Sequence, residues 1–160
     1  PDFPQPGILF RDITPLLSDP EAYRQAITDL AASLRSQNIN QVAAIEARGY
    51  FLGAPLALEL GVGFVPMRKV GKLPSATYRA EYELEYGEAA IEIHRDGLRD
   101  HHRVLLVDDV LATGGTMVAA IDLIRQSGAT VAGVAVLIEL RALMGRQKLD
   151  GHPLTALITL

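Results

Sequence analysis

The 160-residue chain contains no cysteine, which excludes disulfide bonds, thiolate metal sites and cysteine nucleophiles. It also has no signal-peptide pattern and no apolar run of membrane-spanning length, so a soluble cytoplasmic protein is expected. Positive charge is not in excess, because the formal net charge is −4 at pH 7. No overall basic field therefore attracts nucleic acid or an anionic membrane. Any anion that the chain binds must be held by a local site.

Repeats, low-complexity tracts and interdomain linkers are also lacking. The chain is 49% hydrophobic and 21% charged, which is typical of a globular protein. Residues 1–160 are therefore expected to form one domain, long enough to bury roughly 70% of the unfolded surface. The histidines do not have the spacing of metal ligands, and we interpret all of them as surface or structural residues: His94, His101, His102 and His152.

Apolar periodicity predicts helices that alternate with strands. Residues 1–18 have no such period and are expected to form an ordered arm, while residues 70–87 predict a long loop or a mobile hairpin. The predicted helices run from Asp19-Pro20 to about Gln37, from Tyr50 to Leu60, and from Thr116 to a cap at Gly128. The predicted strands cover Val42–Ala47, Phe64–Met67, Ala89–His94, Val104–Val110 and Val131–Leu140.

Strands that are apolar on both faces and alternate with helices indicate an α/β fold, with a parallel sheet covered on two sides. In such sheets ligands bind at the carboxyl ends of the strands. Three unusual segments lie at the carboxyl ends of predicted strands: Glu46 to Gly49, the pair Asp108-Asp109, and Ala112 to Thr116. Their common position predicts a binding site at this edge.

The loop Ala112-Thr-Gly-Gly-Thr116 precedes a predicted helix. Backbone N–H groups of such a loop, together with a helix N-terminus, can bind a phosphate monoester. The alternative is an ordinary strand–helix turn with Thr116 as the N-cap. The loop is not a Walker P-loop, because no Gly-Lys-Ser/Thr follows, and it lacks the dinucleotide G-x-G-x-x-G pattern.

Asp108 and Asp109 place two carboxylates side by side at the tip of an apolar strand. The two charges repel each other, so folding alone gives no reason for the pair. The vicinal hydroxyls of a ribose, or a magnesium ion, would suit both carboxylates. Alternatively, one aspartate caps the turn and the other is solvated.

Arg48 follows another apolar strand. An isolated buried charge there would be costly, and a phosphate partner would offset that cost better than solvent. The alternative is an ordinary surface arginine.

The stretch "VLLVDDVLATGGT" (104–116) resembles the 5-phosphoribosyl-1-pyrophosphate (PRPP) motif of type I phosphoribosyltransferases. Together with "DFPQPGILFRDITPLL", "IEARGYFLGAPLALELG", "RKVGKLP", "LEYG" and "LIELRALMGRQKL", in this order, it resembles the adenine phosphoribosyltransferase family over nearly the whole chain. Departures are small: Glu46-Ala47 stands where some members have Asp-Ser, and Tyr50 where Phe is common. The resemblance implies the type I phosphoribosyltransferase fold, a mostly parallel sheet flanked by helices, with residues 1–18 as a small hood over the base pocket.

The same resemblance implies a purine-salvage reaction in which adenine and PRPP give AMP and pyrophosphate. Mg²⁺ is required and is held mainly through PRPP or pyrophosphate, with no side-chain metal site. A homodimer is also implied. Two alternatives remain open: a phosphoribosyltransferase for a 6-oxopurine, and a non-catalytic PRPP-sensing regulator that binds DNA.

The resemblance also implies a role for individual residues. Arg48 and Glu85 would be catalytic, with Glu85, followed by Tyr86, managing the proton of the purine. A strained peptide bond is often found before the arginine. The 5′-phosphate would lie on Ala112, Thr113, Gly114, Gly115 and Thr116; the ribose hydroxyls on Asp108 and Asp109; pyrophosphate on Ala47, Arg48, Gly49, Arg68, Lys69 and Lys72; and adenine on Leu9, Phe10, Arg11 and Leu140.

Overall fold

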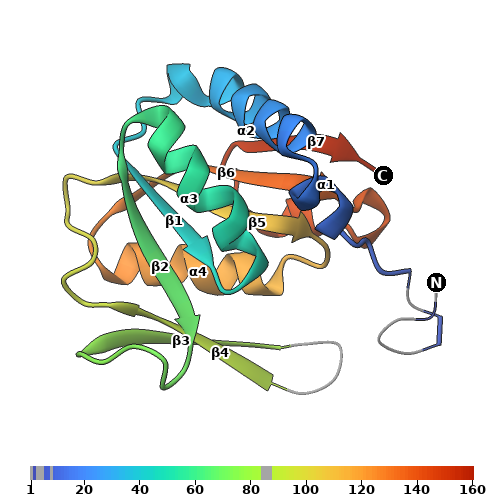
Figure 1. Cartoon of the computed structure of the whole chain (residues 1–160). Coiled ribbons are helices and arrows are strands. Elements are labelled where there is room, and N and C mark those ends of the chain that lie inside the picture. The colour runs from blue at the N-terminus through green and yellow to red at the C-terminus, as the bar shows by residue number, and fades with distance from the viewer. Residues whose placement is uncertain (1, 3–5, 8, 84–87) are drawn as a thin grey trace.

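Figure 1 shows the computed structural model of the chain, which describes residues 2, 6–7, 9–83 and 88–160. In these residues a seven-stranded sheet has the order β3-β4-β2-β1-β5-β6-β7. The strands are β1 (Gln41–Ile45), β2 (Gly63–Lys69), β3 (Thr77–Glu83), β4 (Glu88–His94), β5 (Arg103–Leu111), β6 (Thr130–Glu139) and β7 (Leu154–Thr159).

The neighbouring strands β2, β1, β5, β6 and β7 are parallel to one another, whereas β4 is antiparallel to both β2 and β3. The central strands of the sheet are apolar on both faces, because Val42–Ala44 and Val104–Val107 are fully buried. Such strands need cover on each side. The predicted mostly parallel α/β sheet is thus confirmed.

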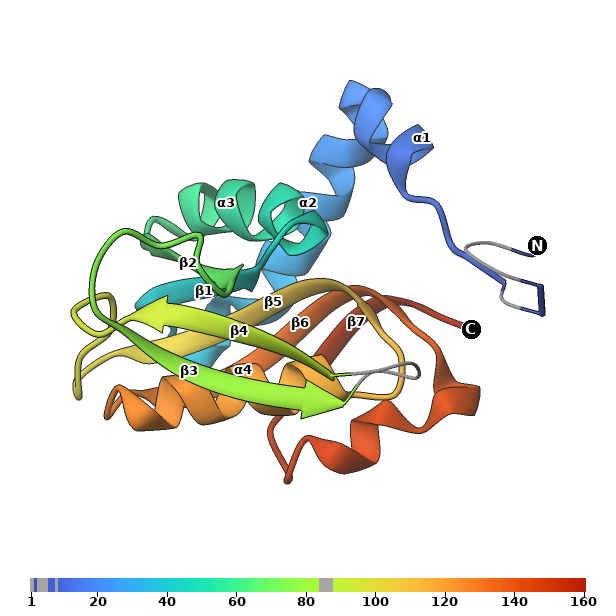
Figure 2. The same cartoon turned by 90° about the horizontal axis from the view of Figure 1, so that it is seen from below.

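The helices supply this cover on both faces (Figures 1 and 2). Helices α2 (Pro20–Leu34) and α3 (Arg48–Leu60) bury Leu30, Leu52 and Leu56 against one face. Helix α4 (Gly115–Gln126) buries Ile121 and Ile124 against the other. Short helices complete the chain: α1 (Thr14–Ser18) and the 3₁₀ turns η1 (Arg35–Gln37), η2 (Arg141–Leu143) and η3 (Gly145–Lys148).

Helix α2 begins as predicted, because the Asp19 side chain accepts hydrogen bonds from the N–H groups of Glu21 and Ala22 at 3.0 Å each. The arm before it differs from the prediction, since it contains the short helix α1. There the Asp12 side chain accepts hydrogen bonds from the N–H and the hydroxyl of Thr14.

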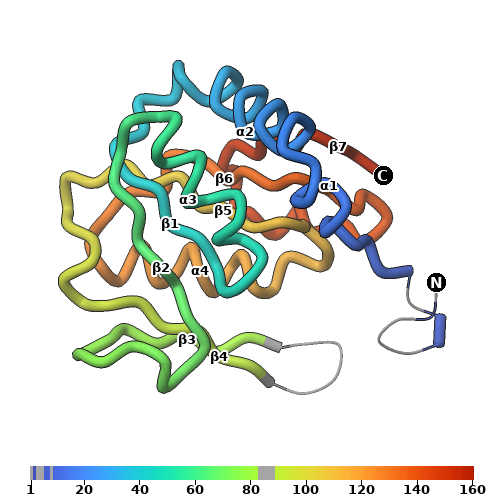
Figure 3. The backbone as a smooth tube through the Cα atoms, in the orientation of Figure 1, coloured from blue at the N-terminus to red at the C-terminus, as the bar shows by residue number. Residues whose placement is uncertain are grey.

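Residues 70–87 were predicted to form a long loop or a mobile hairpin, and the structure favours the hairpin, because residues 77–83 form β3 and pair with β4 (Figure 3). Tyr78, Ala80 and Tyr82 alternate along β3 and pack against the core. The charged residues between them conceal this two-residue period in the sequence. The mobility of the hairpin stays a prediction.

The boundaries of several helices and strands also differ from the predicted ones. Helix α3 begins at Arg48 and not at Tyr50, β1 ends at Ile45 and not at Ala47, and β6 ends at Glu139, one residue before Leu140. Gly128 follows the end of α4 with a positive φ of 80°, as expected for a residue that terminates a helix.

Candidate active site

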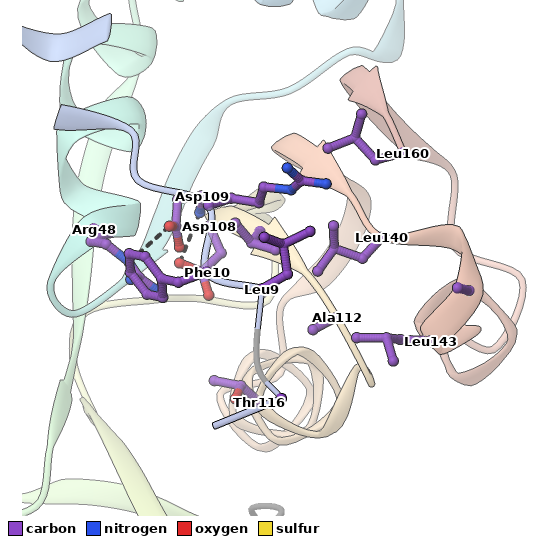
Figure 4. Close-up of a pocket in the computed structure, with 14 residues that line it drawn as sticks. Leu9, Phe10, Arg48, Asp108, Asp109, Ala112, Thr116, Leu140, Leu143 and Leu160 are labelled. Carbon is purple, nitrogen blue, oxygen red and sulfur yellow. Dashed lines mark hydrogen bonds and ion pairs between the residues drawn. The ribbon is translucent and has the colours of Figure 1, made fainter. Parts of the chain in front are cut away.

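A cavity of about 680 Å³ opens at the carboxyl edge of the parallel strands (Figure 4). The arm before α1, the end of β5, the loop that follows it and the segment after β6 all contribute side chains. Because parallel strands end at the same edge, residues far apart in sequence meet here. The edge at which the sequence predicts a binding site therefore carries a cavity large enough for a small molecule.

The loop Ala112–Thr116 lines a recess of about 70 Å³ next to this cavity. Gly114 is the N-cap of α4, with φ of 84° and no side-chain cap. The interpretation of Thr116 as the N-cap is therefore wrong, and Thr116 lies in the first turn of the helix. The positive φ at Gly114 suits glycine. A small recess at an uncapped helix N-terminus can bind an anionic group.

Asp108 and Asp109 lie between the recess and the cavity. Asp109 is 2% exposed, and its Oδ2 lies 2.8 Å from Arg48 Nε. This contact is an ion pair only, because no donor among the described residues is aimed at Oδ2 in hydrogen-bond geometry. Asp108 Oδ1 accepts a hydrogen bond from the N–H of Asp109 at 2.9 Å. Asp109 is thus paired and buried, which contradicts the alternative of a solvated aspartate at that position.

Removal from water, followed by repulsion from Asp109, raises the pKa of Asp108 well above its usual range. A carboxyl group held in this way carries an unfavourable charge at neutral pH. Hydroxyl donors or a cation from a ligand would relieve that cost.

Arg48 lies at the first residue of α3, and its side chain is 46% exposed. The expectation of a buried charge is therefore wrong. The guanidinium carbon lies 5.1 Å from the ring centroid of Phe10, so Arg48 joins the arm to the Asp109 carboxylate (Figure 4). The peptide bond between Glu46 and Ala47 is cis, one bond earlier than the unusual bond expected before Arg48.

Gly49 packs closely against the end of β5. A Cβ atom there would lie 2.9 Å from Asp108 Oδ1 and 3.0 Å from the Val107 carbonyl oxygen. Glycine therefore lets the first turn of α3 approach the aspartates, a packing role that its predicted place in a pyrophosphate loop did not include.

Besides Arg48, three basic residues were predicted for pyrophosphate, and the structure places each of them differently: Arg68, Lys69 and Lys72. Lys69 lines a hollow of about 410 Å³ together with Ala47, Arg48, both aspartates and Tyr82 of β3. Arg68 instead faces Glu46, with Nε and Nη2 each 3.2 Å from a carboxylate oxygen. These bonds lower the pKa of Glu46.

Lys72 lines neither hollow, and its carbonyl oxygen accepts a hydrogen bond from Arg68 Nη1 at 2.9 Å. Glu85 and Tyr86 lie outside the described residues.

All four residues predicted for adenine line the large cavity: Leu9, Phe10, Arg11 and Leu140. Nε of Arg11 is buried and has no hydrogen-bond partner in the described part of the chain. Three of the four side chains are apolar, as expected for a pocket that takes a heteroaromatic ring.

Comparisons with known proteins agree with this geometry. The family model "Phosphoribosyl transferase domain" matches residues 17–154. The chain is similar to an adenine phosphoribosyltransferase of Nocardioides sp., with 58% identity over 99% of this chain and 88% of that protein. It also resembles the solved structure of adenine phosphoribosyltransferase from Thermoanaerobacter pseudethanolicus, at a TM-score of 0.98, 51% identity, and coverage of 100% and 93%.

A third likeness is the structure of the Giardia lamblia enzyme complexed with 9-deazaadenine, at a TM-score of 0.95, 41% identity, and coverage of 100% and 91%. The chain belongs to the adenine phosphoribosyltransferase family. The fold, the family and the enzyme class predicted from the sequence are thereby confirmed.

Some lining residues of this family member were not predicted. Val110, Leu143 and Leu160 also line the large cavity, and Tyr82 lines the hollow near Lys69. These are ordinary apolar or aromatic residues. Val110 lies on β5 beside the aspartates, and Leu143 lies in η2 shortly after the end of β6. Leu160 and Tyr82 reach the site through the pairing of β7 with β6 and of β3 with β4. The sequence held no separate signal for them.

In the described residues no helix is long and apolar enough to cross a membrane. The same residues contain no cluster of three or more His, Cys, Asp or Glu able to hold a metal ion.

Proposed function

We propose that the chain transfers the phosphoribosyl group of PRPP to adenine, giving AMP and pyrophosphate, in cytoplasmic purine salvage. The observation that carries the proposal is one cavity in which an apolar wall, an aspartate pair and a helix N-terminal loop meet. The names of the relatives and the 9-deazaadenine bound to the Giardia lamblia enzyme support it. Residues 1–160 act as one domain, with the arm 1–18 as a hood over the base.

Each part of the site meets one part of the substrates. The N–H groups of residues 112–116 bind the 5′-phosphate, and Asp108 and Asp109 accept hydrogen bonds from the ribose hydroxyls. Phe10 and Leu140 enclose the adenine ring, while Leu9 and Arg11 lie at its edge. The reaction passes through an oxocarbenium-like ribose, so positioning and electrostatics supply the catalysis without a covalent nucleophile.

Pyrophosphate occupies the hollow beside Ala47, Arg48, Gly49 and Lys69. Arg68 takes part when its guanidinium group leaves the Glu46 carboxylate and binds a phosphate oxygen. A charge-assisted hydrogen bond to phosphate can replace one to a carboxylate. Lys72 adds positive charge from the neighbouring turn.

Magnesium fits the same place. Carboxylate oxygens are donors of the kind that Mg²⁺ prefers, and Mg²⁺ commonly takes only one or two of them plus substrate phosphates. Asp108 and Asp109 are such donors, and the described residues hold no larger acidic cluster. When bound, Mg²⁺ stabilises the charge that develops on the leaving pyrophosphate.

Glu85 relays the proton that adenine loses as the bond to ribose forms. Proton management by a positioned side chain contributes about 10²- to 10⁴-fold, so Glu85→Gln should lower kcat by a factor in that range with little change in PRPP affinity. Single-turnover kinetics will measure this effect. A variant that keeps more than half of the wild-type rate would make Glu85 a solvated glutamate without a role.

The test of the function is to offer adenine, guanine, hypoxanthine and xanthine separately with PRPP and Mg²⁺ and to measure pyrophosphate release. Adenine should be used far better than the others. Comparable rates with a 6-oxopurine would overturn the substrate assignment and favour that alternative.

Retention on duplex DNA at moderate salt, without turnover, would favour the alternative of a non-catalytic PRPP-sensing regulator.

A homodimer is also proposed. Sedimentation velocity should give twice the 17.3 kDa of one chain.

A further inference from the structure

The segment between β6 and β7 contacts the backbone of the loop that follows β5. It passes beside α4 (Figure 2) and includes η3, which begins at Gly145. A Cβ atom on Gly145 would lie far inside the van der Waals limit of the Ala112 carbonyl oxygen. It would also lie 3.1 Å from the carbonyl carbon of Ala112 and from the nitrogen of Gly114. The two backbones are therefore in direct contact.

The contact is equally close from the other side. A Cβ atom on Gly114 would lie 2.9 Å from the carbonyl oxygen of Gly145 and 3.2 Å from its Cα. Both surfaces are rigid main chain, so neither side can yield as a flexible side chain would. The position of Gly145 thus limits the shapes that residues 112–114 can adopt.

An ion pair holds Gly145 in this position. Arg146 donates two hydrogen bonds to Glu139, from Nε to Oε1 at 2.8 Å and from Nη2 to Oε2 at 2.5 Å. Glu139 is 4% exposed. It is the last residue of β6 and pairs in register with Leu111, the residue before Ala112. The two-pronged pair therefore fastens η3 to the sheet at the point where the loop leaves it.

The segment has a further anchor at its far end, because Leu149, which is 1% exposed, packs in the core. The Arg146–Glu139 pair adds a second anchor next to the loop.

We propose that Gly145, held by the Glu139–Arg146 pair, is a positioning residue that sets the geometry of the phosphate loop 112–116. The proposal rests on the 5′-phosphate role of that loop. It predicts that disturbance of Gly145 changes affinity for ligands that carry a 5′-phosphate and leaves phosphate-free ligands bound as before. A residue that only stabilised the fold would change the affinities for both kinds of ligand alike.

The test compares the affinities of AMP and adenosine by calorimetry, well below the unfolding temperature. Gly145→Ala should weaken AMP by about 10-fold or more, the loss of at least one charge-assisted hydrogen bond, and should change adenosine by less than about twofold. Gly151→Ala is the matched control. It adds a methyl group at a positive φ of 76° with no atom within 4 Å, so it strains the same segment without touching the loop, and should alter neither affinity.

Arg146→Lys is the second variant. It keeps the charge but loses the two-pronged geometry, so AMP affinity should fall in the same direction by a smaller factor. An unchanged AMP affinity in Gly145→Ala, or an equal loss for adenosine, would overturn the positioning role.

Wild-type protein that binds AMP no more tightly than adenosine would instead remove the phosphate role of the loop, and the inference with it. The two failures are therefore distinguishable.

Discussion

Arg48 is the residue at which the parts of the site meet. Its guanidinium group lies over Phe10 of the arm and beside Asp109 of β5, and its backbone starts α3. The sequence indicated that the residue matters, but for the wrong reason. The cost of a buried charge is borne by Asp109, which is 2% exposed, while the Arg48 side chain is 46% exposed.

Arg48→Ala should lower kcat/KM for PRPP by about 10- to 150-fold, because a charge-assisted bond is worth about 1.5–3 kcal/mol. Steady-state kinetics with varied PRPP will measure the change. Arg35→Ala is the control, since Arg35 also forms an ion pair, with Glu59 at 3.0 Å, but on the surface. Equal kinetics for the two variants would make Arg48 a surface charge without a role in binding.

The ionised Asp108 side chain should lower the free energy of unfolding at neutral pH. Because its pKa is raised in the folded protein, the folded state holds that proton more tightly than the unfolded chain. Its contribution to stability therefore falls as the pH rises from the ordinary value of 3.8 through the raised pKa. Asp108→Asn lacks this loss, so the variant should be more stable than wild type at pH 7, and the difference should shrink as the pH falls toward 4.

Thermal unfolding at several pH values measures this difference, and each kcal/mol corresponds to about 2–4 °C in Tm. Groups with lowered pKa, such as Glu46 and Glu139, act in the opposite sense but are common to both proteins. Asp96→Asn, at an exposed aspartate, is the control. The same Asp108→Asn variant should bind AMP less tightly, and an unchanged AMP affinity would contradict the ribose role.

At the scale of elements, the β3–β4 hairpin is joined to the turn before it by one buried side chain. Glu92 of β4 is 5% exposed. Its Oε1 accepts hydrogen bonds from the N–H groups of Gly71, Lys72 and Leu73 at 3.0, 3.3 and 3.2 Å. Its Oε2 accepts one from the Thr77 hydroxyl at 3.2 Å. One carboxylate thus orders the turn that carries Lys72.

Glu92→Ala should lower the free energy of unfolding by about 1.5–3 kcal/mol, the contribution of a hydrogen bond to a charged group, because the N–H groups of Gly71 and Leu73 lose this acceptor. Urea denaturation will measure the loss, with Glu81→Ala as the control on the same hairpin. Glu81 is exposed and forms a surface ion pair with Arg79, so its removal should cost less than about 1 kcal/mol. Equal effects would contradict a special role for Glu92.

The elements that the sequence predicted best are those with one clear period. Strand β5 and helix α4 are apolar on the faces that the core requires, and both were predicted to within one residue at each described start. Strand β3 was left undecided between a loop and a hairpin, because its buried positions alternate with charged ones and Pro74 precedes it. The start of α3 was misplaced because Arg48 and Gly49 are poor indicators of a helix, and tertiary packing of Gly49 on β5 decides their conformation.

At the scale of the whole molecule, the parallel sheet follows from the composition of its strands, but the closure of the site does not. The position of the aspartates and of the loop 112–116 at the carboxyl edge could be predicted because they lie at the end of a buried strand of a parallel sheet. Leu143 and Leu160 could not, since they reach the cavity through the segments that flank β7, and no local pattern specifies that return.

AMP should stabilise the folded chain as a whole. A ligand at 100 times its Kd adds about 2.7 kcal/mol, which corresponds to a rise of about 5–11 °C in Tm for a chain of this size. Thermal unfolding with and without AMP will measure it, with adenosine at the same concentration as the control. The rise should be much smaller with adenosine. No rise with AMP at millimolar concentration would contradict an AMP site.

In the proposed site, the base-facing side chains at residues 9–11 come from an arm outside the sheet, whereas the groups proposed for ribose and phosphate belong to β5, α4 and the turn between them. On this proposal, the choice of ring and the binding of the sugar phosphate are encoded in separate stretches of chain, with Leu140 after β6 as the exception. Substitutions in the arm can change the accepted base without altering strand register or the core, because Leu9 is more than half exposed and no strand includes it. Such a molecule can acquire a new substrate through a few early residues while its scaffold is inherited unchanged.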